Sequence, residues 1–250
     1  MAKSALRVLQ IMEHVAAQRE GCTHTDLARA LSIPKSSLTG LLRDLESNAY
    51  LQKNLQTGAF SIGVQVLSLA NAYLRSVNIV RLGQPVIGGL FADINEYSML
   101  CIPSGLEYII VCAESVPTPV AHSLQIGHRG PLFCSAVGKA MLASMPLDQC
   151  EAVLRNSDRK AFTPYTKTDL KSIRAELEAI RANGVAYSQE ENFLGVCGIA
   201  SAVLNNAGVP VAAIGVALPL ASAKPQVVRR IEARVKLAAT RFSAQLGWKA

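Results

Sequence analysis

Apolar residues recur at helical spacing in the early part of the chain and then give way to strand-like alternation. Leu27 and Leu31 fall on one face of a short helix. Pro34 ends it, because proline lacks an amide donor and holds the preceding residue out of the helical region. A second helix is predicted from Lys35 to Ser47, where four leucines share one face. Two short strands around a turn at Thr57-Gly58 follow. This order predicts a winged helix-turn-helix.

The polar face of the second predicted helix indicates what this unit binds. In a winged helix-turn-helix, the second helix enters the major groove of DNA and the wing lies along the backbone. A helix-turn-helix can also be a plain packing unit, but the turn, the polar face and the hairpin coincide here, which favours DNA binding. The predicted DNA-contacting residues are Thr25, Lys35, Ser36, Ser37, Thr39 and Arg43 on the helices, with Lys53, Gln56 and Thr57 on the wing.

Beyond the wing, the pattern predicts a connecting helix at residues 64–77 and then a second domain. Hairpins alternate with helices there, which indicates an α+β fold with an antiparallel sheet flanked by helices. We expect strands at 97–102, 107–113, 199–204 and 209–218, and helices at 136–143 and at 169–183, the last capped by Gly184. The predicted division is a DNA-binding domain at 1–63, a linker helix at 64–80 and an effector domain at 81–250.

The charge balance fits a polyanionic partner. The chain has 25 Lys and Arg against 18 Asp and Glu, a net charge of +7. Residues 1–60 contain seven basic and five acidic residues, a local excess of only +2. DNA binding is therefore expected to depend on the placement of a few charges and on two copies of the domain.

The cysteines and the hydropathy indicate a cytoplasmic protein. Cys22, Cys101, Cys112, Cys134, Cys150 and Cys197 are scattered in apolar stretches without a C-x-x-C pair, which is typical of reduced thiols. Glu13 and His14 interrupt the early apolar run, so no signal peptide is expected. The most apolar stretch, 209–223, is too short to span a bilayer and contains Pro219, so no membrane partner is expected.

Two groups of motifs follow one another along nearly the whole chain. The first is SALRVLQIMEHV, LARALSIPKSSLTGLLRDLESNAYL and TGAFSIG, and the second is GHRGPLFCSAVGKAMLA and IRANGVAYSQEENFLGVCGIASAVLNNAGVPVAAIGVALP. In this order they resemble the IclR-type bacterial transcriptional regulators. Where many members of that family carry a His-Arg pair, this chain has Thr39-Gly40. The operator sequence therefore does not carry over.

The resemblance implies a winged helix-turn-helix joined by a linker helix to a GAF-like effector-binding and oligomerisation domain. It further implies a homodimer or a dimer of dimers that acts on a double-stranded DNA operator of a catabolic operon. A small organic acid is the implied effector, and RNA polymerase is a further candidate partner.

The turn before the helix expected at 136–143 is the strongest ligand feature. Free backbone donors at a helix N-terminus favour a carboxylate or phosphate, although the turn could merely start the helix with Ser135 as its cap. In the resembled family small organic acids lie against this turn, and side chains on the late strands hold small polar acids. The corresponding residues here are Ser188, Gly198, Gly215 and Ala217, of which only Ser188 has a polar side chain. This implies a spacious, apolar pocket for an aromatic or longer-chain acid. The implied effector-binding residues are Cys134, Ser135, Ala136, Val137, Ser188, Gly198, Gly215 and Ala217.

Catalytic and metal chemistry find less support in the sequence. A cysteine nucleophile needs a base within reach, and Cys134 has His122 and His128 nearby in sequence, but no oxyanion arrangement is evident. Glu190 and Glu191 point opposite ways on an extended segment, so a solvated or interdomain role is expected. The four histidines lack metal-ligand spacing, and no motif indicates a cofactor. The chain is predicted to be a regulator and not an enzyme. The alternative is a small-molecule-binding enzyme or sensor whose N-terminal unit only mediates dimerisation.

Overall fold

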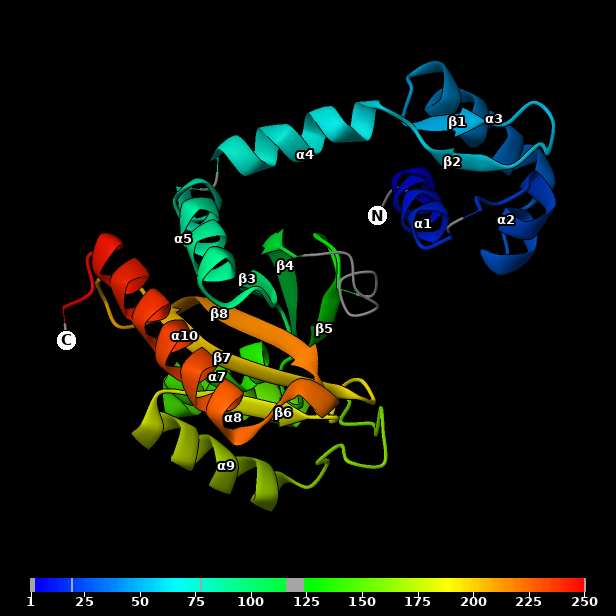
Figure 1. The fold of residues 1–250 in the computed structure, drawn as a ribbon. Coiled ribbons are helices and arrows are strands. Elements are labelled where there is room, and N and C mark those ends of the chain that lie inside the picture. Colours follow the sequence, from blue (N-terminus) through cyan, green and yellow to red (C-terminus); the bar gives the residue numbers. More distant parts are fainter. Residues whose placement is uncertain (1–2, 19, 77, 116–123, 250) are drawn as a thin grey trace. The chain divides into compact units, whose positions relative to one another are not determined.

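The leucine face of the predicted second helix packs into the core of an N-terminal unit, Met1–Asn78, in the computed structural model (Figure 1). The structure describes residues 3–18, 20–76, 78–115 and 124–249. Leu27, Leu38 and Leu42 are buried against Phe60 of the wing. The elements of this unit are α1 (Lys3–Ala16), α2 (His24–Ala30), α3 (Lys35–Ser47), β1 (Leu51–Lys53), β2 (Phe60–Ile62) and α4 (Gln65–Ser76).

The helix ends in this unit follow local sequence signals. The Thr23 hydroxyl accepts a hydrogen bond from the Asp26 amide at 3.3 Å and starts α2 as part of a capping box. Pro34 occupies the N-cap position of α3. The first wing strand ends at Lys53, so Leu55 lies outside it and is 92% exposed instead of packing into the core. The reason is the Asn54 side chain, whose Oδ1 accepts hydrogen bonds from the amides of Gln56 and Thr57 and folds this segment into a turn.

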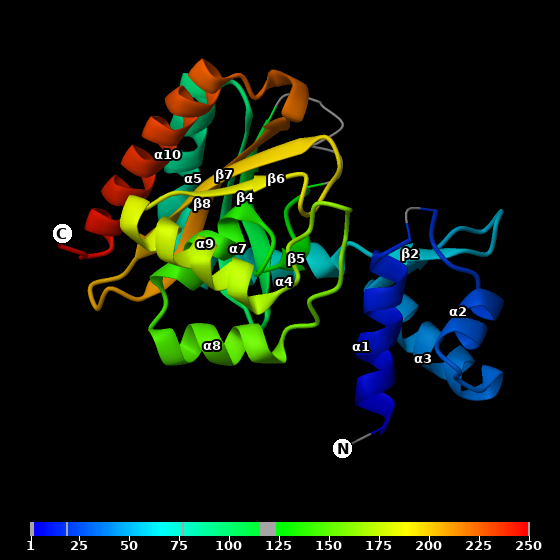
Figure 2. The ribbon, with the colours of Figure 1, turned by 90° about the horizontal axis from the view of Figure 1, so that it is seen from below.

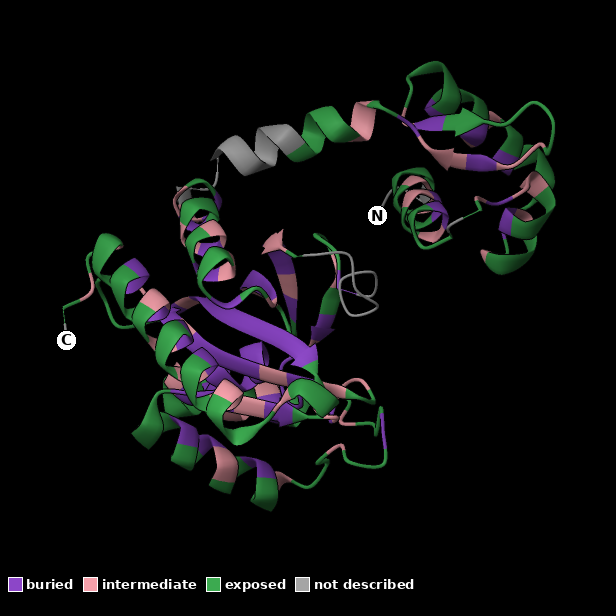
Figure 3. Ribbon diagram, viewed as in Figure 1, coloured by how far each residue is buried: buried purple, intermediate pink, exposed green. Residues whose placement is uncertain are grey.

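The second unit, Ile79–Ala250, is built on a six-stranded sheet in which every neighbouring pair is antiparallel. The strand order is β5-β4-β3-β8-β7-β6. The strands are β3 (Tyr97–Ser104), β4 (Glu107–Glu114), β5 (Arg129–Pro131), β6 (Ala186–Gln189), β7 (Val196–Leu204) and β8 (Pro210–Pro219). Central strand β8 is buried along most of its length, as Figure 3 shows, which explains its continuous apolar sequence.

Helices cover both faces of this sheet (Figure 2). The helices are α5 (Asn78–Ile94), α7 (Ala136–Ser144), α8 (Leu147–Asn156), α9 (Leu170–Asn183) and α10 (Pro225–Gln245). α7, α8 and α9 share one core cluster with β3, β4 and β8, and α5 and α10 lie on the other face. Gly83 of α5 lies so close to Leu100 that an added Cβ would meet its Cδ2 at 2.4 Å.

The sequence predicted both hairpins and the helices near 136 and 169, but it missed α5, α8, α10 and β6. α10 carries an apolar stripe at Ile231, Val235, Ala239 and Phe242, all buried, so its spacing alone could have revealed it. The end of the expected linker, residue 80, falls inside α5. Gly184 ends α9 in the left-handed conformation at φ 73°, as expected for a C-terminal glycine.

Candidate DNA-binding and effector-binding sites

The predicted DNA-contacting side chains are all exposed in the N-terminal unit. Lys35, Ser36, Ser37, Thr39 and Arg43 lie on α3, Thr25 lies on α2, and Lys53, Gln56 and Thr57 lie on the wing. Within the described part of the chain, Lys35 and Arg43 form no ion pair. Two unpaired cations on one exposed helix are free to meet phosphates.

Three of these side chains already have partners within the protein. The Thr57 hydroxyl accepts a hydrogen bond from the Ala59 amide at 3.3 Å. The Thr39 hydroxyl donates to the Lys35 carbonyl oxygen at 2.9 Å and lies 3.0 Å from Nε2 of His24. The Lys53 ammonium lies 5.6 Å from the centre of the Phe60 ring. Thr39 can therefore meet DNA only as a partly satisfied hydroxyl. His24, to which the sequence pattern assigns no special role, joins α2 to α3 at this surface.

Six of the eight predicted effector residues line a small cavity at the N-terminus of α7. This cavity, which we call the α7 cavity, has a volume of about 40 Å³. Ser135, Ala136, Val137, Ser188, Gly198 and Ala217 line it together with Met99, Tyr108, Leu124, Asn192, Phe193 and Val196. Its lining is largely apolar, as expected. Its volume differs from the expected spacious pocket, because Phe193, Tyr108 and Met99 occupy the space beside the small late-strand residues.

The N-terminus of α7 is capped by the Ser135 side chain and still has backbone amides without an acceptor in the described part of the chain. The Ser135 hydroxyl donates to the Pro131 carbonyl at 2.7 Å and accepts from the Gly138 amide at 3.1 Å. Among the described residues, no hydrogen-bond acceptor meets the amides of Ala136 and Val137. Gly138 lets the helix start this close to the preceding turn, since an added Cβ would lie 2.3 Å from Leu132 backbone atoms. The turn therefore does both things that the sequence allows. The Ser135 hydroxyl caps the helix, and the amides of Ala136 and Val137 stay available to a ligand.

Cys134 and Gly215 do not line the α7 cavity. The Cys134 carbonyl accepts the Ser188 hydroxyl at 2.9 Å, so Ser188 is also engaged inside the protein. Gly215 lies behind Val137, where an added Cβ would come within 2.5 Å of the Val137 Cγ1. A large residue at 215 would therefore displace Val137 and α7 instead of filling the pocket.

Three lining residues that the sequence pattern does not reveal form an aromatic and amide wall of the cavity. Tyr108 comes from β4, and Asn192 and Phe193 come from the loop between β6 and β7. The His128 ring lies 6.4 Å from the Tyr108 ring and 6.0 Å from the Phe193 ring, centre to centre. Burial lowers the pKa of His128, which favours its neutral form. No spacing in the sequence links these residues, because only sheet pairing and the loop path bring them together.

Glu191 corrects the expectation of a solvated acidic pair. Its side chain is 6% exposed, and its Oε1 lies 2.6 Å from the Nζ of Lys139, which is fully buried on α7. Lys139 also contacts Glu176 of α9 at 2.6 Å. Burial raises the pKa of Glu191, while the Lys139 ammonium opposes that shift. Glu190 points elsewhere and accepts the Gly195 amide at 2.8 Å. Glu191 thus ties the Asn192–Phe193 segment to α7.

The cysteine-enzyme alternative finds no support at Cys134. Its thiol is buried, which raises its pKa to about 12 and keeps it protonated at neutral pH. His128 packs against aromatic rings, and His122 lies outside the described residues. In the described ranges no group of His, Cys, Asp or Glu could hold a metal ion, and no helix there is long and apolar enough to cross a membrane.

Comparisons with known proteins agree with this geometry. Residues 71–244 match the model of the bacterial transcriptional regulator IclR C-terminal domain, and residues 4–55 match the IclR helix-turn-helix domain. The HTH-type transcriptional repressor AllR of Klebsiella pneumoniae is 27% identical over 248 residues, which cover 99% of this chain and 91% of that protein.

Solved structures establish the likeness of fold. The crystal structure of Thermotoga maritima IclR has a TM-score of 0.82 at 20% identity, covering 99% of this chain and 100% of that one. An IclR homologue from Microbacterium hydrocarbonoxydans, crystallised with 4-hydroxybenzoate, has a TM-score of 0.78 at 22% identity, covering 97% of this chain and 100% of that one.

Proposed function

The chain belongs to the IclR family of bacterial transcriptional regulators, and from this premise we propose that an organic acid in the α7 cavity controls its binding to an operator. It is a regulator with an effector-binding domain and not an enzyme. The proposed division of labour is DNA binding by residues 1–63, connection by 64–80 and effector binding by 81–250. Because the target is DNA, we place its action in the cytoplasm. The curated relative carries the name repressor, which supports repression as the mode of control.

The exposed, unpaired cations of α3 support DNA contact by this helix. The test is a gel shift with the DNA upstream of the chain's own gene, followed by footprinting. A dimer should protect two half-sites of a pseudo-palindrome about one helical turn, or a multiple of it, apart. A short asymmetric footprint would overturn symmetric binding, and no shift at low salt would overturn the DNA contact itself.

Exposed leucines on two helices of the N-terminal unit support a homodimer. Leu6 and Leu9 of α1 are 50% and 60% exposed, and Leu67 and Leu69 of α4 are 60% and 54% exposed. Leu9→Glu should lower the mass seen by sedimentation, because a buried charge opposes association. Leu147→Glu, at a 68% exposed position of α8, is the matched control and should leave the mass unchanged. The wild-type mass itself distinguishes a dimer from a dimer of dimers.

The single observation that carries the effector proposal is a pair of amides, those of Ala136 and Val137, that have no acceptor among the described residues and belong to two residues lining the largely apolar α7 cavity. A carboxylate would accept hydrogen bonds from Ala136 and Val137, helped by the positive end of the helix dipole. The relative crystallised with 4-hydroxybenzoate supports an aromatic acid. A cavity of about 40 Å³ is far below the roughly 300 Å³ of ordinary ligand pockets, so an aromatic effector requires the segment bearing Asn192 and Phe193 to move outward.

A proline at the first position of α7 tests the carboxylate contact. Ala136→Pro removes one amide donor where proline is tolerated, and Ser135 already has the extended backbone (ψ 148°) that proline requires before it. We expect the affinity ratio of benzoate to benzamide, measured by calorimetry, to fall about tenfold or more. Leu147→Pro, at the first position of α8, is the control for proline itself. An unchanged ratio would place the carboxylate elsewhere.

A further inference from the structure

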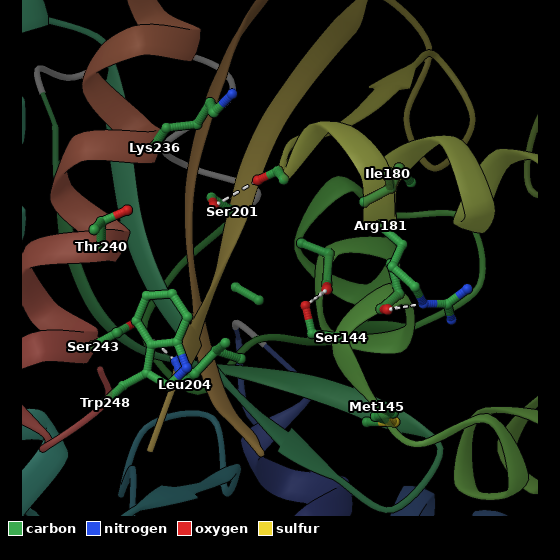
Figure 4. Close-up of a pocket in the computed structure, with 14 residues that line it drawn as sticks. Ser144, Met145, Ile180, Arg181, Ser201, Leu204, Lys236, Thr240, Ser243 and Trp248 are labelled. Atoms are coloured by element: carbon green, nitrogen blue, oxygen red, sulfur yellow. Dashed lines mark hydrogen bonds between the residues drawn. The ribbon is translucent and has the colours of Figure 1, made fainter. Parts of the chain in front are cut away.

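A second and larger cavity lies at the C-terminal end of α7, whereas the α7 cavity lies at the N-terminus of that helix. It has a volume of about 400 Å³ and lies between β7, α10 and the ends of α7 and α9 (Figure 4). We call it the edge cavity. It shares no lining residue with the α7 cavity. Its volume falls within the range of about 300–1,000 Å³ that ligand pockets occupy.

The floor of the edge cavity is the end of β7 that β6 does not reach. β6 begins at Ala186, which pairs with Ala200, while β7 continues to Leu204. The Glu190 amide, which follows β6, donates to the Val196 carbonyl at 2.9 Å. In an antiparallel sheet the backbone N–H and C=O groups of successive residues point to opposite neighbouring strands. The even-numbered residues of β7 therefore point their backbone groups toward the β6 side. The N–H and C=O of Ala202 therefore point to the open edge.

Polar groups of the residues near Ala202 have hydrogen-bond partners, whereas the backbone N–H and C=O of Ala202 have none among the described residues. The Leu204 amide donates to the Ser243 hydroxyl at 2.9 Å, and the Ser201 hydroxyl donates to the Gly184 carbonyl at 2.8 Å. Within the ranges that the structure describes, the Ala202 backbone has no hydrogen-bond partner on this side. A half-buried, adjacent donor and acceptor match the edge of a cyclic amide, which presents C=O and N–H side by side.

One wall of the edge cavity is aromatic. It is formed by Trp248, the single tryptophan of the chain, whose indole lies next to Leu204 in Figure 4. Trp248 lies beyond residues 71–244, the part that matches the family domain.

The charge of the lining is one-sided. Arg181 and Lys236 belong to the lining, and among the described residues no acidic side chain joins them there. Arg181 donates through Nε to the Ala143 carbonyl at 2.9 Å, and neither cation forms an ion pair in the described part of the chain. A cleft with cations alone attracts an anionic ligand.

We propose that the edge cavity is a second small-molecule site, which takes a planar, carboxylate-bearing heterocycle with a cyclic amide edge. The amide edge exchanges two hydrogen bonds with Ala202, the ring lies against Trp248, and the carboxylate is attracted by Lys236 and Arg181. This site is separate from the proposed organic-acid site at α7 and does not depend on it.

The lone tryptophan makes the test direct, because its fluorescence reports this cavity only. The probe is 2-pyridone-5-carboxylate, added to the full-length protein, with calorimetry alongside. We expect saturable quenching of Trp248 emission. The N-methylated pyridone lacks the donor and nicotinate lacks the cyclic amide, so both should bind at least about tenfold more weakly. Lys236→Met should weaken the carboxylate probe several-fold and leave uncharged 2-pyridone unchanged. Lys171→Met, at an exposed position of α9, is the matched control.

Three outcomes would overturn the proposal. The first is no quenching and no binding heat at millimolar probe. The second is equal binding of the N-methylated pyridone. The third is emission that changes with protein concentration alone, which would assign the open edge of β7 to a second copy of the chain. Ala136→Pro must leave the quenching intact, so failure at the α7 cavity and failure at the edge cavity are told apart.

Discussion

Helices α3 and α7 each contribute to a candidate binding site, and each carries a lysine. The two lysines lie in opposite environments. Lys35, at the first position of α3, is exposed and has no ion pair among the described residues. Lys139, in the second turn of α7, is fully buried between Glu176 and Glu191. An unpaired exposed charge is available to a ligand, whereas a charge enclosed by two carboxylates holds the protein together. The same residue type therefore lies on a candidate DNA-binding surface in one unit and in a buried ion cluster in the other.

The buried ion cluster of Lys139, Glu176 and Glu191 also has a functional consequence. Glu191 precedes the two residues that close the α7 cavity, and the Thr166 hydroxyl fixes its backbone by donating to its carbonyl at 2.6 Å. Lys139 thus holds the helix and the loop that face each other across the cavity. Any opening for an aromatic acid must bend this loop while the ion cluster persists, or must break the cluster.

The largest expected effect comes from removing the buried lysine. Lys139→Met leaves Glu191 and Glu176 without their shared cation, and breaking a buried pair costs about 3–5 kcal/mol of unfolding free energy. Lys167→Met is the matched control, because Lys167 contacts the same Glu176 at 3.0 Å but is 45% exposed; it should cost at most about 1 kcal/mol. Urea unfolding measures both.

The pH dependence of the Lys139→Met deficit sharpens this result. In the variant Glu191 loses the Lys139 ammonium that opposes the effect of burial, so its folded-state pKa lies further above its unfolded value. Protonation then favours the folded state, so the deficit should shrink as pH falls from 7 toward the ordinary glutamate pKa of about 4.3. Equal losses in the two lysine variants, or a deficit independent of pH, would contradict the assignment of Lys139 to the buried ion cluster.

A methyl group at Gly215 should have the next largest effect. Gly215→Ala brings Cβ within 2.5 Å of the Val137 Cγ1, and such overpacking costs about 1–3 kcal/mol. Gly198→Ala is the comparison, because its Cβ would meet the Ala136 Cβ at a milder 3.2 Å. Thermal unfolding should rank Gly215→Ala below Gly198→Ala in stability. The reverse ranking would mean that an added Cβ has more room at Gly215 than at Gly198.

The exposed cations of α3 should change DNA binding without changing stability. Lys35→Ala and Arg43→Ala should each lower the slope of log affinity against log salt by about 0.9 per lost phosphate contact and monomer. Lys171→Ala, an exposed lysine of the other unit, serves as the control. If neither α3 variant alters affinity or slope, the face of α3 that meets DNA is assigned wrongly.

Gly40 of α3 gives the smallest expected effect. An added Cβ would meet no atom within 4 Å, so Gly40→Ala should raise the unfolding free energy by up to about 1 kcal/mol through helix propensity. Its effect on DNA affinity then separates two explanations for the glycine. A loss of affinity indicates close approach of DNA at this position, whereas unchanged affinity indicates that the neighbouring side chains do the reading. A loss of stability would contradict the open space.

The sequence by itself determined the local elements and the resemblance to a family. The Lys35–Ser47 helix, the two hairpins and the Gly184 cap depend on periodicity and on residues adjacent in the chain, and all three appear in the structure. The N-terminus of α7 was also visible, because a helix start is a local event. Residues far apart in sequence were not: Tyr108, Asn192 and Phe193 reach the α7 cavity only through strand pairing and the loop after β6.

Only the tertiary structure decided which polar groups are free and which are used. Glu191 and Lys139, 52 residues apart, form a buried pair, and burial removes from both the role that an exposed charge would have. Gly215 proved to be a packing position because Val137 lies against it. Ala202 looked like one more apolar strand residue, yet its backbone lies open where β6 falls short of β7. Spacing along a chain reports which face a residue occupies, but solvent access and pairing depend on what packs against that face.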